Sequence, residues 1–88
     1  MEQLKLFTLV KDYETLKNMG MVMSVNYQSR GAYGTTYHIK IKKDILNHIT
    51  MHALSDIVFN KFMGVYGGSI DTKPCTDYIY ITVMSYND

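Results

Sequence analysis

The 88-residue sequence predicts one α+β domain over residues 1–88, with a four-stranded antiparallel sheet and two helices on one face in the ferredoxin-like order β-α-β-β-α-β. Two patterns support this prediction. Four segments alternate, or carry apolar residues on both sides, as strands do. Two further segments repeat apolar residues at helical spacing, and the first of these is short. Right-handed crossovers then place both helices on the same face of the sheet.

The first predicted strand, Leu4–Val10, has apolar residues on both sides, which suits a central position in a sheet. A short helix is predicted after it, because Asp12 is a residue type that caps helix N-termini and Gly20 is placed to end the helix. Met21–Gln28 then alternates and predicts a half-buried strand. Its predicted buried side carries Met21, Met23, Val25 and Tyr27.

A hairpin is predicted next, because the glycine-containing segment Ser29–Gly34 has the composition of a turn. The returning strand, Thr35–Lys42, alternates between inward apolar residues and an outward set formed by His38, Lys40 and Lys42. The two strands are therefore expected to pair as neighbours in the sheet.

The second half of the chain predicts a long helix over Asp44–Met63, with Asp44 as its N-cap and Gly64 as its stop. Gly64–Asp77 has no strong period and predicts a loop, in which two adjacent glycines can turn a very small hairpin. Thr76–Tyr86 alternates most regularly and predicts the last strand.

Composition restricts the class of protein. A formal net charge of +1 argues against binding of polyanions by charge alone. Cys75 is the single cysteine and cannot form an internal disulfide, so we expect a cytoplasmic protein in a reducing compartment. The first ten residues lack the pattern of a signal peptide, and no stretch is apolar enough to predict a membrane span.

The sequence predicts no enzyme and no cofactor, because no nucleophile has an activating histidine beside it and no phosphate-binding glycine motif occurs. His48 and His52 have the i, i+4 spacing of zinc-binding pairs on a helix, and Asp44 and Asp56 extend the same stripe. The residue after His48 is not the glutamate of zinc-dependent proteases. The stripe is therefore interpreted as solvated, and the two histidines are kept only as weak metal candidates.

The sheet face opposite the helices carries the main functional prediction. Its last strand presents large side chains with apolar area and hydroxyl groups: Tyr78, Tyr80, Met84 and Tyr86. We therefore predict a small non-enzymatic binding protein whose partner is another protein, or a second copy of the chain bound through this face or through the edge of the last strand. Its size suits an accessory or inhibitory factor of the sort that phages and mobile elements encode.

The alternative prediction is a module that binds single-stranded nucleic acid, in particular RNA. Such a module needs cations for the phosphates and rings on which bases stack. The same face would supply them through Lys5, Phe7, His38, Lys40 and Lys42, together with the tyrosines. The sequence leaves both alternatives open.

Overall fold

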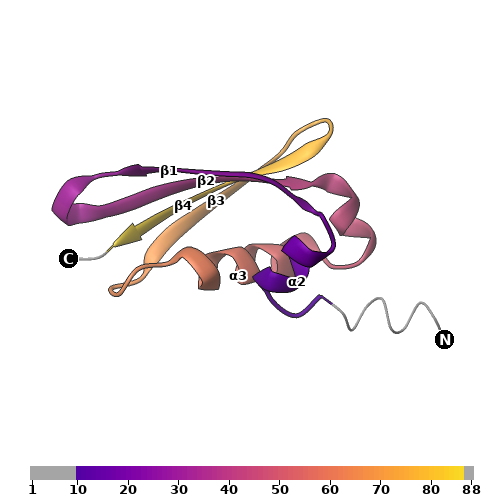
Figure 1. Ribbon diagram of the computed structural model, residues 1–88, viewed down its shortest axis with the longest axis horizontal. Helices are drawn as coiled ribbons and strands as arrows, with labels where there is room; N and C mark the ends of the chain where they lie inside the picture. Colours follow the sequence, from indigo (N-terminus) through magenta and orange to yellow (C-terminus); the bar gives the residue numbers. More distant parts are fainter. Residues whose placement is uncertain (1–9, 87–88) are drawn as a thin grey trace.

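The computed structural model describes residues 10–86, in which four antiparallel strands form one sheet and two helices lie on one face of it (Figure 1). The helices are α2 (Tyr13–Asn18) and α3 (Met51–Phe62). The strands are β1 (Val22–Ser29), β2 (Gly34–Lys42), β3 (Gly68–Pro74) and β4 (Tyr78–Tyr86). The predicted α+β class and the four-stranded antiparallel sheet with two helices are confirmed.

The order of the strands is β1-β2-β4-β3, which is not the predicted ferredoxin-like order. In that order the strand predicted at Leu4–Val10 would lie between the second strand of the hairpin and the last strand. Here β2 pairs directly with β4 along its whole length. The described elements therefore run α-β-β-α-β-β along the chain. Residues 4–9 of the predicted first strand lie outside the described residues.

The core lies between α3 and the sheet face formed by alternate residues of β2 and β4. Its fully buried side chains are Leu16, Ile39, Ile41, Ile45, Leu54, Val58, Ile79, Ile81 and Val83. Each such side chain contributes about 1.5–3 kcal/mol relative to leaving it in water. This layer is therefore the main source of stability, and it confirms the predicted inward face of the segment that forms β2.

Helix α2 begins where the sequence predicts. The Asp12 carboxylate accepts hydrogen bonds from the backbone amide of Thr15 and from its hydroxyl, both at 3.0 Å. These two bonds, the amide first, hold the pKa of Asp12 below its usual value. After the helix, Gly20 adopts a φ of 75°, the left-handed conformation that ends helices.

Asp12 is expected to make the stability of the protein depend on pH in acid. Its pKa is lower in the folded state, so its contribution is complete above the unfolded value of about 3.9 and is lost as pH falls through the folded value. The measurement is thermal unfolding of the wild type and Asp12→Asn from about pH 6 to about pH 2. The difference between their melting temperatures should be constant above about pH 5 and should change below about pH 4. A difference that stays constant over the whole range contradicts this role.

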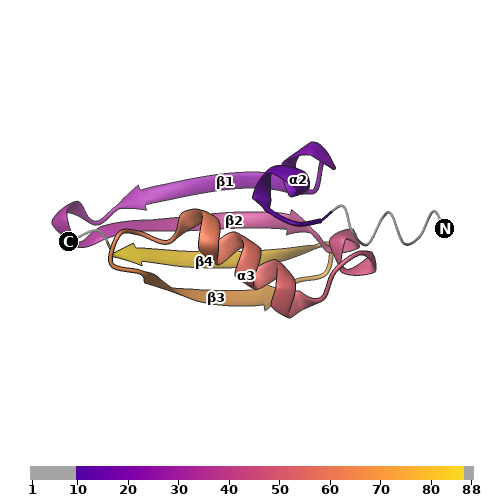
Figure 2. The ribbon, with the colours of Figure 1, turned by 90° about the horizontal axis from the view of Figure 1, so that it is seen from below.

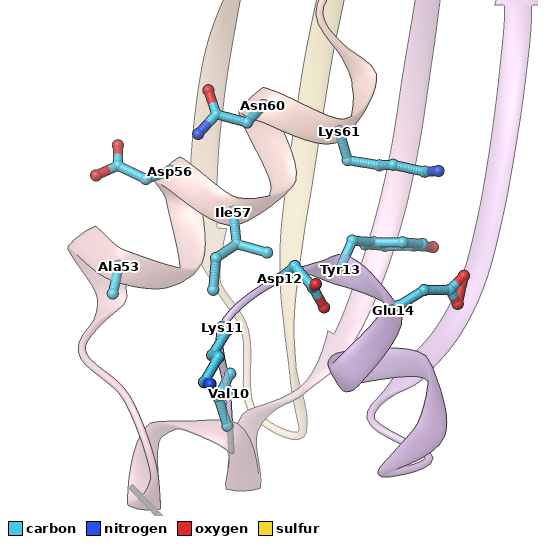
Figure 3. Close-up of a pocket in the computed structure, with 10 residues that line it drawn as sticks. All are labelled: Val10, Lys11, Asp12, Tyr13, Glu14, Ala53, Asp56, Ile57, Asn60 and Lys61. Carbon is cyan, nitrogen blue, oxygen red and sulfur yellow. The ribbon is translucent and has the colours of Figure 1, made fainter. Parts of the chain in front are cut away.

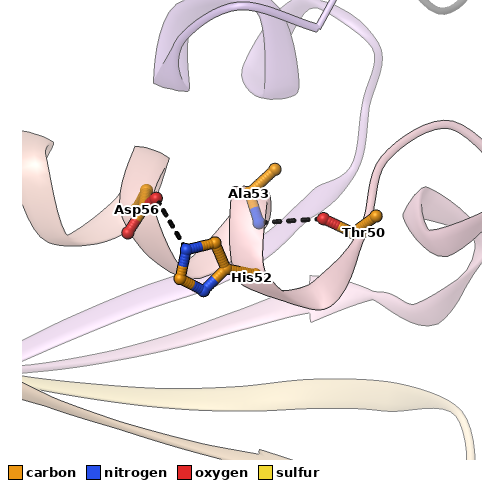
Figure 4. A network of polar contacts seen from close by, with 4 residues as sticks. All are labelled: Thr50, His52, Ala53 and Asp56. Atoms are coloured by element: carbon orange, nitrogen blue, oxygen red, sulfur yellow. Dashed lines mark hydrogen bonds and ion pairs between the residues drawn. The ribbon is translucent and has the colours of Figure 1, made fainter.

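The predicted helix Asp44–Met63 is divided in the structure. Lys43–Asn47 forms a 3₁₀-helix, and α3 begins only at Met51. Thr50 is the N-cap of α3, because its hydroxyl accepts the amide of Ala53 at 3.1 Å (Figure 4). Thr50 also has extended backbone angles (φ −80°, ψ 162°), which interrupt the helical run. The prediction of Asp44 as N-cap is therefore wrong, because a threonine side chain that bonds the backbone starts the helix later than the apolar period indicates.

The predicted loop Gly64–Asp77 contains strand β3. It pairs with β4 from Gly68 opposite Ser85 to Pro74 opposite Ile79. A tight turn precedes it and uses the positive φ of 89° at Gly67. The loop prediction is wrong because β3 is a mainly polar strand, and such a strand carries too few apolar residues for hydrophobic alternation to indicate it.

Strand β1 forms the predicted hairpin with β2, but its apolar side is not half-buried. The pairing shifts by one residue between Val22 and Ser24. Beyond this shift Val25 is 38% exposed and Tyr27 is 72% exposed. Helix α3 lies against β3 and β4, and α2, which contacts α3, covers only the start of β1 (Figure 2). The described residues therefore leave most of the helix side of β1 uncovered.

Candidate functional site

The sheet face away from α2 and α3, here called the open face, has a shallow depression of about 440 Å³. Residues of all four strands and of the turn between β3 and β4 line it: Ser24, Asn26, His38, Lys40, Lys73, Cys75, Tyr78 and Tyr80. The strand register assembles this set, because Lys40 lies opposite both Ser24 and Tyr80, and Tyr80 lies opposite Lys73. Every charged residue in the lining is a lysine, so we call it the basic depression.

His38 and Tyr80 form the best-ordered pair in the basic depression. The Tyr80 hydroxyl and His38 Nδ1 share a hydrogen bond of 2.8 Å. Their rings are stacked, with centroids 5.9 Å apart and an angle of 19° between the planes. They are diagonal neighbours on β2 and β4, a spacing that aromatic side chains can bridge. The hydrogen bond and the ring contact together restrict the rotamers of both side chains.

Lys40 and Tyr78 form the second pair. The Lys40 Nζ lies 4.9 Å from the centroid of the Tyr78 ring, within the range of a cation–π interaction. The Cys75 side chain raises the pKa of Tyr78, first through a hydrogen bond and then through its charge. The Tyr78 hydroxyl, protonated at neutral pH as in any tyrosine of ordinary or raised pKa, can both donate and accept a hydrogen bond.

The structure places all four predicted partner-binding residues on the open face but brings only two of them together. Tyr78 and Tyr80 line the basic depression, whereas Met84 and Tyr86 are exposed toward the other end of β4. At that end the Arg30 guanidinium lies 5.6 Å from the centroid of the Tyr86 ring.

The residues of the nucleic-acid alternative are also placed separately. His38 and Lys40 line the basic depression, and Lys42 is exposed opposite Tyr78. Lys5 and Phe7 lie outside the described residues. Lys73 was missed by sequence reasoning, because its place beside Tyr80 depends on the pairing of a polar strand that carries no apolar period.

The histidine pair does not lie on one helical stripe. His48 follows the 3₁₀-helix, while His52 is in the first turn of α3 beyond the cap at Thr50. His52 Nε2 lies 3.5 Å from an oxygen of the Asp56 carboxylate, and both side chains are exposed (Figure 4). Among residues 10–86 no group of three or more His, Cys, Asp or Glu side chains is arranged to hold a metal ion. The prediction that His48 and His52 lie one turn apart on a single helix, which made them metal candidates, is therefore wrong.

A second shallow hollow, of about 650 Å³, lies between the start of α2 and α3 (Figure 3). Its lining residues are Val10, Lys11, Asp12, Tyr13, Glu14, Ala53, Asp56, Ile57, Asn60 and Lys61. The charges are of both signs, and some have structural partners. Asp12 caps α2, and Lys61 Nζ lies 5.8 Å from the centroid of the Tyr13 ring. This mixture selects no class of ligand, so the basic depression is the better candidate.

Comparison with known proteins assigns no family to the chain. No family model, no curated protein and no solved structure matches it. Within residues 10–86, no helix is long and apolar enough to cross a membrane.

Proposed function

We propose that this chain is a small non-enzymatic binding protein whose open face contacts an acidic surface of a protein partner, as an accessory or inhibitory factor would. The basic depression carries the proposal. Its charged residues, Lys40 and Lys73, are both cationic, and they stand among half-buried tyrosine and histidine rings. Complementary charge across an interface increases the association rate and selects the partner.

Preorganisation supports a protein partner. The hydrogen bond between His38 and Tyr80, and the contact between Lys40 and Tyr78, hold four side chains in place before anything binds. Binding then costs less side-chain entropy, which is the advantage that rigid aromatic residues have in interfaces. The exposed Met84 and Tyr86 extend the surface along β4, whose nine residues span roughly 30 Å.

Single-stranded nucleic acid is the second candidate, and the three lysines Lys40, Lys42 and Lys73 favour it. Base stacking, however, needs rings with an available face. The Tyr78 ring has an ammonium group above one face, and the Tyr80 ring is stacked on His38. These internal contacts fit protein contact better than base stacking.

The proposal is tested by reversing charges in the basic depression. The double variant Lys40→Glu, Lys73→Glu should lower the affinity for the partner by about tenfold or more, because both cations would then face an acidic surface. The matched control is Lys11→Glu, Lys17→Glu, which makes the same change of charge at exposed positions in and beside α2. The measurement is capture from a nuclease-treated lysate of the native host. The captured protein is then titrated against the wild type, the variant of the basic depression and the control variant.

Equal affinity of the two double variants would overturn the assignment to the open face. Two results together would identify the ligand as nucleic acid: capture that disappears on nuclease treatment, and oligonucleotide binding that weakens steeply with salt. The proposal of a protein partner would then be wrong. If a protein is captured and only the variant of the basic depression loses it, the proposal is supported.

A further inference from the structure

Two strands form the edges of the described sheet, and they differ in chemistry. Among residues 10–86, β1 pairs only with β2, and β3 pairs only with β4. The edge strand β3 carries Asp71, Lys73 and Pro74, residue types that hinder the addition of another strand. The edge strand β1 has no charged residue and no proline in its eight residues. Within the part of the chain that the structure describes, one edge is therefore protected and the other is suitable for pairing.

The backbone of β1 has outward groups at defined positions. The amide of Arg30 donates to the Gly34 carbonyl at 2.8 Å, at the end of the ladder between β1 and β2. Bonded residues alternate along an antiparallel ladder, so Gln28 and Asn26 direct their amides and carbonyls toward β2. By the same alternation Val25 and Tyr27 direct theirs away from the sheet.

The side chains of the same two residues are exposed apolar ones in the regular part of β1, whereas the third exposed apolar residue of the strand, Met23, lies in its irregular part. Val25 and Tyr27 alternate on the helix side of β1, and α3 lies against β3 and β4 instead. Next to them runs a shallow groove of about 410 Å³, lined by Tyr13, Lys17, Val22, Val25, Lys61 and Phe62. An unprotected edge supplies the main-chain hydrogen bonds of strand addition, and aromatic and β-branched side chains suit the pairing that follows.

We propose that β1 is a homodimer edge, at which β1 of a second copy adds in antiparallel orientation about a two-fold axis through Asn26. This register places Val25 opposite Tyr27 of the second copy, twice, on the helix side. It places Ser24 opposite Gln28 of the second copy, twice, on the open side. β-Branched and aromatic pairs are among the favourable cross-strand pairs. The register also uses the regular part of β1 and leaves its irregularity at Val22–Ser24 outside the centre.

A second copy fits this edge because the strand is complementary to itself. A two-fold axis brings each residue of β1 against β1 again, so any charge on the strand would meet a like charge nearby. The lysine of the basic depression nearest to β1 is Lys40, one strand away on β2. The two copies of Lys40 would be three strand spacings apart across the sheet and four residues apart along the strands, roughly 20 Å in all, which exceeds the Debye length of about 8 Å at physiological salt.

The dimer would be one continuous eight-stranded sheet with both sets of helices on the same side. Ser24 and Asn26, which line the basic depression, belong to β1, so the two depressions would adjoin at the axis. The inference does not rest on the function proposed above, because strand addition uses the backbone of β1 and its helix-side residues Val25 and Tyr27, and not the lysines of the basic depression.

The test is sedimentation of the purified full chain from about 5 µM to about 500 µM. The wild type should shift from monomer to twice the monomer mass within this range. Val25→Lys, Tyr27→Lys should stay monomeric, because it places lysines opposite lysines across the axis. Val25→Glu, Tyr27→Glu should also stay monomeric, because it places glutamates opposite glutamates. An equimolar mixture of these two variants should recover the dimer mass, since each lysine then faces a glutamate.

The control Ser69→Lys adds a lysine to the exposed edge of β3 and should dimerise like the wild type. The single variant Tyr27→Lys, at a largely exposed position, replaces the double variants if circular dichroism shows that they do not fold. It should raise the dimer dissociation constant by about tenfold or more. Three results would each overturn the proposal: a wild type that stays monomeric throughout, a mixture that fails to associate, or a control that loses the dimer. The first would mean that β1 does not pair with a second copy of the chain.

Discussion

Gly34→Ala is expected to destabilise the protein by about 3 kcal/mol or more and to lower its melting temperature by about 10–20 °C. Gly34 starts β2 with φ 130° and ψ −149°, a backbone region open almost only to glycine. A Cβ at this position would also overlap the carbonyl oxygen of Ser85 on β4. Arg30 donates to the same oxygen at 2.6 Å. The start of β2, the Ser85 backbone of β4 and the Arg30 side chain would therefore have to move apart. The total stability expected for 88 residues is only about 5–13 kcal/mol.

Gly31→Ala is the matched control, three residues earlier. Gly31 also has a positive φ, of 71°, but nothing lies within 4 Å of the Cβ that would be added. The substitution should cost only the backbone strain of a left-handed residue, about 1 kcal/mol. Thermal or urea unfolding of the wild type and both variants measures the difference. Equal melting temperatures of the two variants would show that the overlap with Ser85 does not add to the loss of stability.

Ile81→Ala is the second change with a large expected effect, at about 2–5 kcal/mol. Ile81 is fully buried at the middle of β4, where it lies opposite Ile39 of β2 and Thr72 of β3. The alanine would leave a cavity between the sheet and α3 that strands paired on both sides cannot collapse to fill. Chemical unfolding should show the lower midpoint with an unchanged slope.

Ile81→Val tests whether that loss follows the number of methyl groups removed. It should cost about 0.5–1.5 kcal/mol, because a single methylene is deleted. If Ile81→Ala and Ile81→Val are equally stable, the centre of the core does not lie at this position, contrary to its complete burial.

Much of the fold can be predicted from local patterns. The alternation of β2 and β4 indicated their inward and outward faces, and the cap at Asp12 indicated the start of α2. The strand order could not be predicted, because it depends on the pairing of β2 with β4, which are more than thirty residues apart in sequence. β3 was missed for a related reason. A polar strand is held by its backbone pairing rather than by its own apolar pattern.

The candidate site divides in the same way. Alternation within single strands placed His38, Lys40, Tyr78 and Tyr80 on one face of the sheet. The contributions of Lys73 to the depression and of Arg30 to the Tyr86 end required the register between strands. The stripe of His48 and His52 failed because a cap at Thr50 changed the direction of the chain between them.

The central position of β4 has a consequence for synthesis on the ribosome. β4 follows every other described element in the chain, yet it lies between β2 and β3. A nascent chain that has released β1, β2 and α3 still lacks the strand against which Ile39 and Ile41 are buried. These apolar residues, and the inner edge of β2, stay open to other nascent chains until β4 has emerged. Insertion of β4 ends this exposure, so a slower closure of the sheet would lengthen the time for which these residues are open to aggregation.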